Sequence, residues 1–179
     1  MLLSIILGLA ITQILLGCRA LLLARERVRF GAPTLIWCVV LLVLFAQGWW
    51  SMFGLRDHAT WTFGEFAVIL LQVILQYLLA AIVLPEVPAT GGVDLPRHYA
   101  KQQRWFFAIA ILVAATSLGK DFVFDGHLPD AANLGFHLAF ITACVAAALI
   151  RARWFALLNA AVVATGIGAY IVVLFAQLG

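Results

Sequence analysis

The chain has 179 residues, of which 65% are apolar and 11% are charged, and its mean hydropathy is +1.10. Soluble domains average roughly half apolar and roughly a quarter charged residues, so this composition excludes an ordinary soluble globular fold. The net charge of +3 is small and gives no indication of a nucleic-acid partner.

Long apolar runs separated by short polar breaks follow one another along the chain. In lipid only helices and closed barrels satisfy every backbone polar group, and unbroken runs of about 17–25 apolar residues favour helices. We therefore predict an all-α fold, a polytopic membrane helix bundle of about six transmembrane helices in a single domain, residues 1–179. The expected spans are 2–22, 33–55, 61–84, 104–118, 131–150 and 154–178.

Basic residues gather in alternate breaks between these spans. The breaks after the first, third and fifth spans hold eight of the eleven Lys and Arg residues, namely Arg25, Arg27, Arg29, Arg97, Lys101, Arg104, Arg151 and Arg153. Loops rich in Lys and Arg stay in the cytoplasm. We therefore expect both termini outside, in the inner (cytoplasmic) membrane of a bacterium. Near span ends lie Trp49, Trp50, Trp61, Trp105 and Trp154, where indole rings anchor at the headgroup level.

The third span carries a polar stripe formed by Glu65, Gln72 and Gln76. Their spacing puts the three side chains on one helical face, and polar groups in hydrocarbon usually turn to the bundle interior. One interpretation is a polar pathway with Glu65 as its ionisable group near the outer mouth. The alternatives are a capping box between Thr62 and Glu65, and interhelical hydrogen bonds made by the two glutamines.

The longest connection follows the third span, where residues 85–92 are rich in Pro and Gly. Asp94 can cap a helix beyond it, and Arg97, Lys101 and Arg104 then form one basic stripe. We expect this stripe at the depth of the inner headgroups, before the chain turns into the fourth span. Anionic lipid phosphates are its expected ligands, and a cytoplasmic protein partner is the alternative.

Polar residues also occur inside the second, fifth and sixth spans. One face of the sixth span carries Asn159, Gly166, Tyr170 and Gln177. Gln13 of the first span and Gln47 of the second could join this face to the stripe of the third. His137 in the fifth span is the seventh residue predicted to line the pathway or pocket, with Glu65, Gln72, Gln76, Gln47, Asn159 and Tyr170. It has three interpretations: a hydrogen-bonded structural histidine, a proton or polar-network role, or a haem ligand. Bis-histidine haem ligation needs a second histidine at similar depth, and the spans contain none, so no cofactor is predicted.

The outer breaks place acidic and histidine side chains within reach of one another. Carboxylate oxygens and imidazoles can hold a divalent metal ion, which makes a weak candidate site of Asp57, His58, Asp121, Asp125 and His127. Their spacing matches no metal-binding motif, and acidic outer loops are ordinary, so an unliganded surface is the alternative.

Three functions remain open from the sequence. The leading hypothesis is a small transporter or channel with a polar pathway between the third and sixth spans. A non-catalytic membrane scaffold or accessory subunit is the first alternative, and a membrane enzyme or sensor with an outer-face site is the second. No catalytic residue is predicted, because the sequence has no GxSxG or HExxH motif. The expected partners are membrane lipids, with a second copy of the chain or another membrane protein as further candidates.

Overall fold

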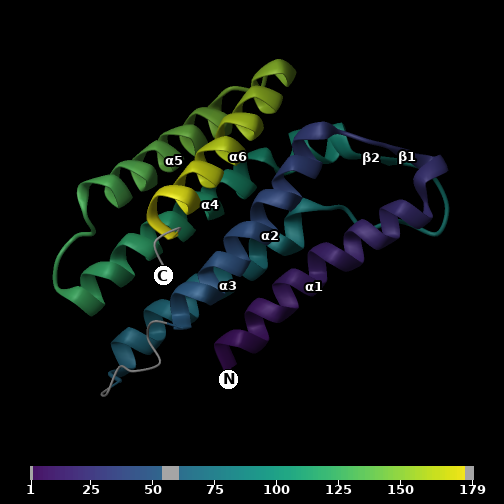
Figure 1. The fold of residues 1–179 in the computed structure, drawn as a ribbon. Helices are drawn as coiled ribbons and strands as arrows, with labels where there is room; N and C mark the ends of the chain where they lie inside the picture. Colours follow the sequence, from purple (N-terminus) through teal and green to yellow (C-terminus); the bar gives the residue numbers. More distant parts are fainter. Residues whose placement is uncertain (1, 54–60, 176–179) are drawn as a thin grey trace.

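The computed structural model describes residues 2–53 and 61–175, and helices dominate it (Figure 1). Successive helices run in opposite directions: α1 Leu2–Leu23, α2 Ala32–Phe53, α3 Phe63–Val83, α4 Leu95–Asp125, α5 Ala131–Leu149 and α6 Arg153–Phe175. A turn of 3-10 helix, η1 (Arg25–Arg27), and two short strands, β1 (Val28–Arg29) and β2 (Val93–Asp94), lie in the connections. The prediction of an all-α fold with six long helices is confirmed.

Each of these six helices is long and apolar enough to cross a membrane. Their outer faces carry large apolar side chains that are half or more exposed, among them Leu9, Leu16, Leu71, Leu138 and Val162. Exposing such continuous apolar surface to water would cost about 25 cal/mol for each Å². The structure is therefore compatible with an integral membrane protein whose outer faces contact lipid.

The fourth helix differs from the expected span 104–118, because α4 runs without interruption through 31 residues, Leu95–Asp125. Asp94 caps its first turn by accepting a hydrogen bond from the Arg97 amide at 2.8 Å, as predicted. No turn separates the basic stripe from the span. The helix ends at Gly126, whose φ of 72° is the left-handed conformation that glycine adopts without strain. At about 46 Å, α4 is longer than a hydrocarbon core of about 30 Å.

The two short strands tie together the α1–α2 and α3–α4 connections. They pair in parallel, with Val28 opposite Val93. Arg27 donates hydrogen bonds from Nη1 to the carbonyl oxygens of Ala89 and Gly91, both at 3.1 Å. The carboxylate of Asp94 accepts another from Arg29 at 3.3 Å. We call this end of the bundle the strand end and the opposite end, where α3 and α5 begin, the polar end.

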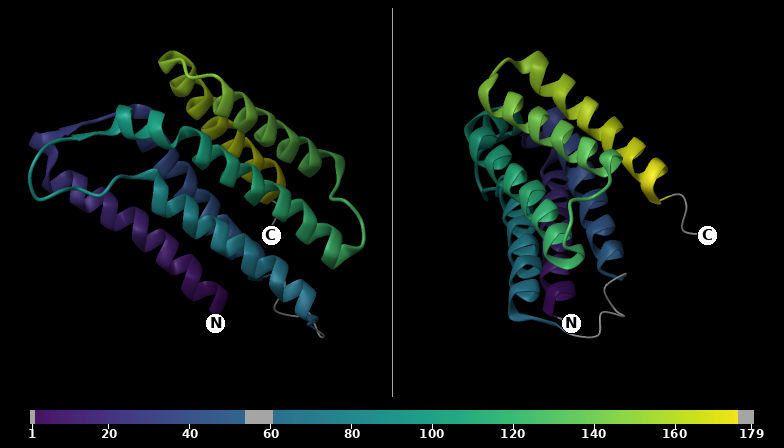
Figure 2. Two further views of the ribbon diagram at one scale, coloured as in Figure 1. Left: turned by 180° about the vertical axis from the view of Figure 1, so that it is seen from behind. Right: turned by 90° about the vertical axis from the view of Figure 1, so that its left-hand side faces the viewer.

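Five of the helices form a closed ring. Each helix from α2 to α6 contacts the next, and α6 contacts α2 again. The remaining helix, α1, lies at the edge of the bundle and packs on α2 and α3 (Figures 1 and 2). Gly17 of α1 allows a close approach to Leu84, because a Cβ at position 17 would lie 2.8 Å from Cδ1 of Leu84. The ring formed by α2 to α6 encloses space between α3 and α6.

Candidate functional site

A cavity of about 400 Å³, not fully enclosed, lies inside the ring of α2 to α6. Most of its wall is apolar, including Leu41, Phe45, Leu79, Phe140, Val163 and Ile167. Ten polar side chains also line it: Gln47, Ser51, Gln72, Gln76, Ser117, Lys120, Asp121, Asn133, His137 and Tyr170. Most of these polar residues lie in the halves of the helices nearest the polar end. The cavity is therefore amphipathic along its length.

A hydrogen-bond network links three helices at the polar end. The Tyr170 hydroxyl of α6 donates to Oδ1 of Asn133 on α5 at 3.2 Å, and Tyr170 also interacts with Gln47 of α2. Nδ1 of His137 donates to the carbonyl oxygen of Asn133 at 2.9 Å. In a neutral imidazole Nε2 is then an acceptor, and the Ser117 hydroxyl of α4 donates to it at 3.2 Å. This arrangement supports the structural interpretation of His137.

The charged residues that line the described part of the cavity are Lys120 and Asp121 of α4. Lys120 Nζ lies 3.6 Å from Asp121 Oδ1, and each side chain is 19% exposed. Two opposite charges at this separation compensate one another in a medium of low dielectric constant. The cavity therefore carries no net formal charge on these two groups.

Midway along α3, Gln72 and Gln76 project into the cavity from buried positions. Gln76 is 4% exposed and Gln72 is 8% exposed. The carbonyl oxygen of the Gln76 side chain has no hydrogen-bond partner in the described structure. Gly48 of α2 gives this side chain its room, because a Cβ there would lie 3.2 Å from Gln76 Nε2. An unpaired amide thus borders the space between α2 and α3.

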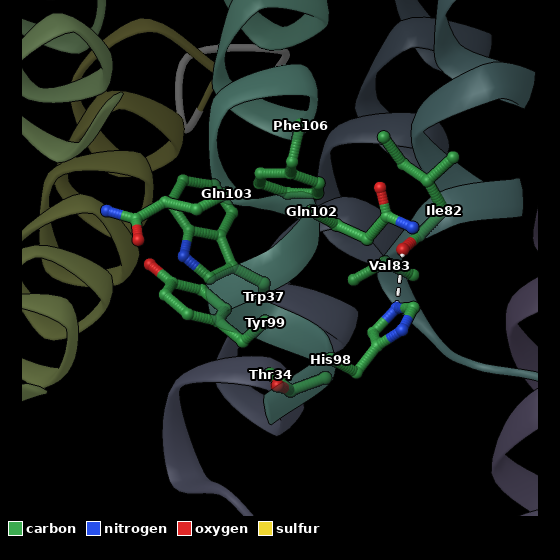
Figure 3. A pocket seen from close by; sticks show the side chains of 9 residues that line it. All are labelled: Thr34, Trp37, Ile82, Val83, His98, Tyr99, Gln102, Gln103 and Phe106. Carbon is green, nitrogen blue, oxygen red and sulfur yellow. Dashed lines mark hydrogen bonds between the residues drawn. The ribbon is translucent and has the colours of Figure 1, made fainter. Parts of the chain in front are cut away.

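At the strand end an aromatic cluster closes the cavity. The Trp37 ring packs edge to face against Phe106 and Phe107, with centroid distances of 5.1 and 5.4 Å. Beyond it lies a second pocket of about 10 Å³, the space of one water molecule, bordered by Thr34 and Tyr99 (Figure 3). Trp37 lines both spaces. Its side chain therefore forms the wall between the cavity and this inner pocket.

The inner pocket contains polar groups without partners. The indole N–H of Trp37, the hydroxyl of Thr34 and the hydroxyl of Tyr99 are buried with no hydrogen bond in the described structure. The Tyr99 hydroxyl is turned toward the Trp37 nitrogen and interacts with it, but the two do not reach hydrogen-bond geometry (Figure 3). The Trp37 ring is therefore held by packing and not by a hydrogen bond.

The polar residues of α4 near the strand end cap its two neighbours. His98 Nε2 donates to the carbonyl oxygen of Ile82 at 2.9 Å, in the last turn of α3 (Figure 3). Gln103 Nε2 donates to the carbonyl oxygens of Ala147 and Ile150, the latter at 2.9 Å. Carbonyls at a helix end lack partners within the helix, so these side chains supply the missing donors.

Five of the seven predicted pathway residues meet at the cavity: Gln47, Gln72, Gln76, His137 and Tyr170. Glu65 does not line it. This residue forms the predicted capping box with Thr62, whose amide donates to Glu65 Oε2 at 2.6 Å. Asn159 does not line it either, because Asn159 Nδ2 donates to the carbonyl oxygen of Ala143 at 2.9 Å and joins α6 to α5.

Several lining residues were missed from the sequence, chiefly Ser117, Lys120 and Asn133. The signal was present in the spacing. Ser117, Lys120 and Asp121 recur at three and four residues on α4, and Asn133 and His137 are four apart on α5. Helical phase applied to the fourth and fifth spans would have found both sets.

The metal-site candidates are not brought together in the described residues. Asp57 and His58 lie outside the described residues, as does the side chain of Asp125. Asp121 pairs with Lys120, and His127 Nδ1 donates to the neighbouring Leu128 carbonyl oxygen at 2.9 Å. Within residues 2–53 and 61–175 no group of three or more His, Cys, Asp or Glu could hold a metal ion. The metal site stays a prediction.

The predicted basic stripe lies on the surface of α4. Arg97, Lys101 and Arg104 are all exposed and follow one another along the first turns of the helix. Trp105, the next residue, is 69% exposed on the same stretch.

No family model, no curated protein and no solved structure matches the chain.

Proposed function

We propose that this protein is a membrane transporter that holds one small solute in the cavity between α3 and α6. The observation that carries the proposal is the shape of this cavity, which is walled by five helices, polar toward one end and closed by Trp37 at the other. Its volume of about 400 Å³ falls in the range of small-molecule sites. Closure at one end favours a transporter with alternating access over an open channel, and the solute enters at the polar end.

The distribution of charge supports an orientation for this transporter. The α1–α2 connection, the start of α4 and the α5–α6 connection all lie at the strand end, and they carry eight of the eleven basic residues. By the positive-inside rule this end faces the cytoplasm. We accordingly propose that the protein lies in a bacterial inner membrane, that its cavity opens outward, and that both termini are outside.

Water access to Gln76 tests the proposal. The variant Gln76→Cys is made in a chain whose Cys18, Cys38 and Cys144 are replaced by alanine. We expect a membrane-impermeant, water-soluble thiol reagent added to intact cells to label it, because the cavity admits water and the thiolate forms only in a hydrated environment. Labelling is measured by the mass of the purified protein.

Leu71→Cys in the same background is the matched control, because Leu71 is 50% exposed on the outer face of the same helix. A cysteine there faces lipid and is expected to stay unlabelled. If Gln76→Cys is as unreactive as Leu71→Cys, the cavity is dry. The protein would then be better explained as a scaffold whose polar residues, such as Asn159 and Gln103, hold helices together.

The basic stripe is proposed to bind anionic lipid headgroups. A Lys or Arg near an anionic surface contributes about 1 kcal/mol to membrane attraction. Replacing Arg97, Lys101 and Arg104 together with glutamine is expected to lower the amount of phosphatidylglycerol that copurifies with the protein from mixed-lipid membranes, measured by native mass spectrometry. The control exchanges the same charges, as Arg97→Lys, Lys101→Arg and Arg104→Lys, and should retain the lipid. Equal retention by both variants would refute the lipid site.

A further inference from the structure

The side chain of Gln76 is a buried amide that lacks a partner. Its carbonyl oxygen has no hydrogen bond within the described structure, although the residue is only 4% exposed. Buried polar groups in folded proteins are nearly always paired, so an orphaned acceptor beside a cavity indicates a group that the structure does not contain. An amide oxygen pairs with an N–H or O–H donor.

The surroundings of Gln76 leave the oxygen of its amide without a partner. Its Nε2 packs against Gly48, whose lack of a side chain makes room for the amide, because a Cβ there would lie 3.2 Å from Nε2. Gln72, one turn earlier on α3, is 8% exposed and lines the same cavity. Two neighbouring carboxamides offer donors and acceptors together, which matches a ligand group that has both, such as a carboxamide or a hydroxyl.

The charges of the cavity exclude an ionic ligand at this depth. The charged residues of the described lining, Lys120 and Asp121, lie in the last turns of α4 and pair with one another. Around Gln76 the wall is formed by apolar side chains such as Leu41, Phe45 and Leu79. An ion moved there would lose its hydration without gaining a counter-charge, whereas an apolar body would be favoured.

We propose that Gln76 and Gln72 form the binding site for the uncharged carboxamide or hydroxyl group of a small amphipathic solute, whose apolar part occupies the cavity toward Trp37. This inference rests on the proposed transport function and names the class of its substrate. The solute is neutral and amphipathic. Sugars, inorganic ions and amino acids fall outside this class.

Three probes of similar size test the proposal: para-fluorobenzamide, para-fluorobenzoate and para-fluorotoluene. Their binding to the full chain in lipid nanodiscs is followed by fluorine NMR, with empty nanodiscs as the reference. We expect the amide to bind more tightly than the carboxylate. Gln76→Leu is expected to weaken the binding of the amide probe by about tenfold or more, which is equivalent to the loss of one hydrogen bond. The binding of the toluene probe should not change.

The control is Asn159→Leu. Asn159 is also a buried amide with an unpaired oxygen, 5% exposed, but it lies outside the cavity lining, so the variant should keep the preference for the amide. Gly48→Ala provides a second route to the same site, because the added methyl group displaces the Gln76 amide, and it should weaken the amide probe as well.

Two results overturn the inference. One is equal binding of the amide and the carboxylate, and the other is an amide affinity that neither Gln76→Leu nor Gly48→Ala changes. Either result leaves the transport proposal standing as long as Gln76→Cys is labelled from water. If Gln76→Cys is not labelled and no probe binds, both proposals fail.

Discussion

Replacing Trp37 with alanine is expected to open the cavity toward the strand end and turn it into a leak. The indole borders both the main cavity and the inner pocket, so its removal joins the two spaces toward the strand end. Proteoliposomes containing Trp37→Ala should take up glycerol several-fold faster than those containing the unchanged chain, measured by light scattering after an osmotic step. The variant should also be less stable by about 3–5 kcal/mol, as for other buried aromatic residues replaced by alanine.

Trp105→Ala is the matched control for this experiment. Trp105 is 69% exposed on the outer face of α4, so its loss should change neither glycerol uptake nor stability to a comparable degree. Trp37→Phe restores a ring that can pack against Phe106 and should keep the vesicles tight. A folded Trp37→Ala protein whose vesicles remain as tight as those of Trp105→Ala would contradict the role of Trp37 as the closure.

The second large effect is expected at Gln103, which joins α4 to α5. Gln103 is 5% exposed, and its Nε2 donates to two carbonyl oxygens at the end of α5, those of Ala147 and Ile150. Leucine in its place leaves the buried Ala147 carbonyl and the partly buried Ile150 carbonyl without this donor. We expect Gln103→Leu to lower the free energy of unfolding by about 1–3 kcal/mol, measured by titration with sodium dodecyl sulfate in mixed micelles.

Gln102→Leu separates this hydrogen bonding from a general loss of polarity. The Gln102 side chain points away from that of Gln103, toward Ile82 (Figure 3). It is therefore expected to change stability far less. If Gln103→Leu and Gln102→Leu unfold at the same concentration of sodium dodecyl sulfate, the two hydrogen bonds made by Gln103 contribute little to stability.

The helices were predictable because apolar run length reports directly on membrane-spanning segments. Five of the six begin and end within about a turn of the expected ranges, with 54, 55 and 176–178 outside the described residues. The exception is α4. Asp94 was identified as its cap, but a separate turn before the span needs a helix-breaking residue, and the chain has none between Arg97 and Arg104. Polar residues at the start of a long helix indicate that the helix extends out of the lipid, not that the helix is broken there.

The candidate site was predictable in helical phase but not in depth. Glu65 and Asn159 lie on the same faces as the cavity-lining residues of α3 and α6, seven residues before Gln72 and Gly166 respectively. Seven residues displace a side chain by about 10 Å along the helix axis. Glu65 consequently lies in the first turn of α3, at the polar end, and Asn159 lies toward the strand end, and neither side chain lines the cavity. The spacing of polar residues in the sequence specifies their angle around a helix. The ends of the cavity depend instead on how all five helices pack.

The closure at Trp37 could not be inferred from the sequence. Five tryptophans near span ends indicated interface anchors, and all five are exposed. Trp37 is 1% exposed because Phe106 and Phe107, about 70 positions away in the chain, pack against it. Contacts between residues so distant in sequence leave no mark in local hydropathy.

Lys120 and Asp121 carry opposite charges that cancel, and this cancellation bears on how the membrane potential acts on the cavity. A single elementary charge carried through the membrane field gains or loses about 2.3 kcal/mol for each 100 mV. The positive and negative groups lie 3.6 Å apart on one helix, and the proposed solute is uncharged, so loading the cavity moves almost no net charge through that field. For the proposed uncharged solute we therefore expect polarised and depolarised membranes to fill the cavity equally well.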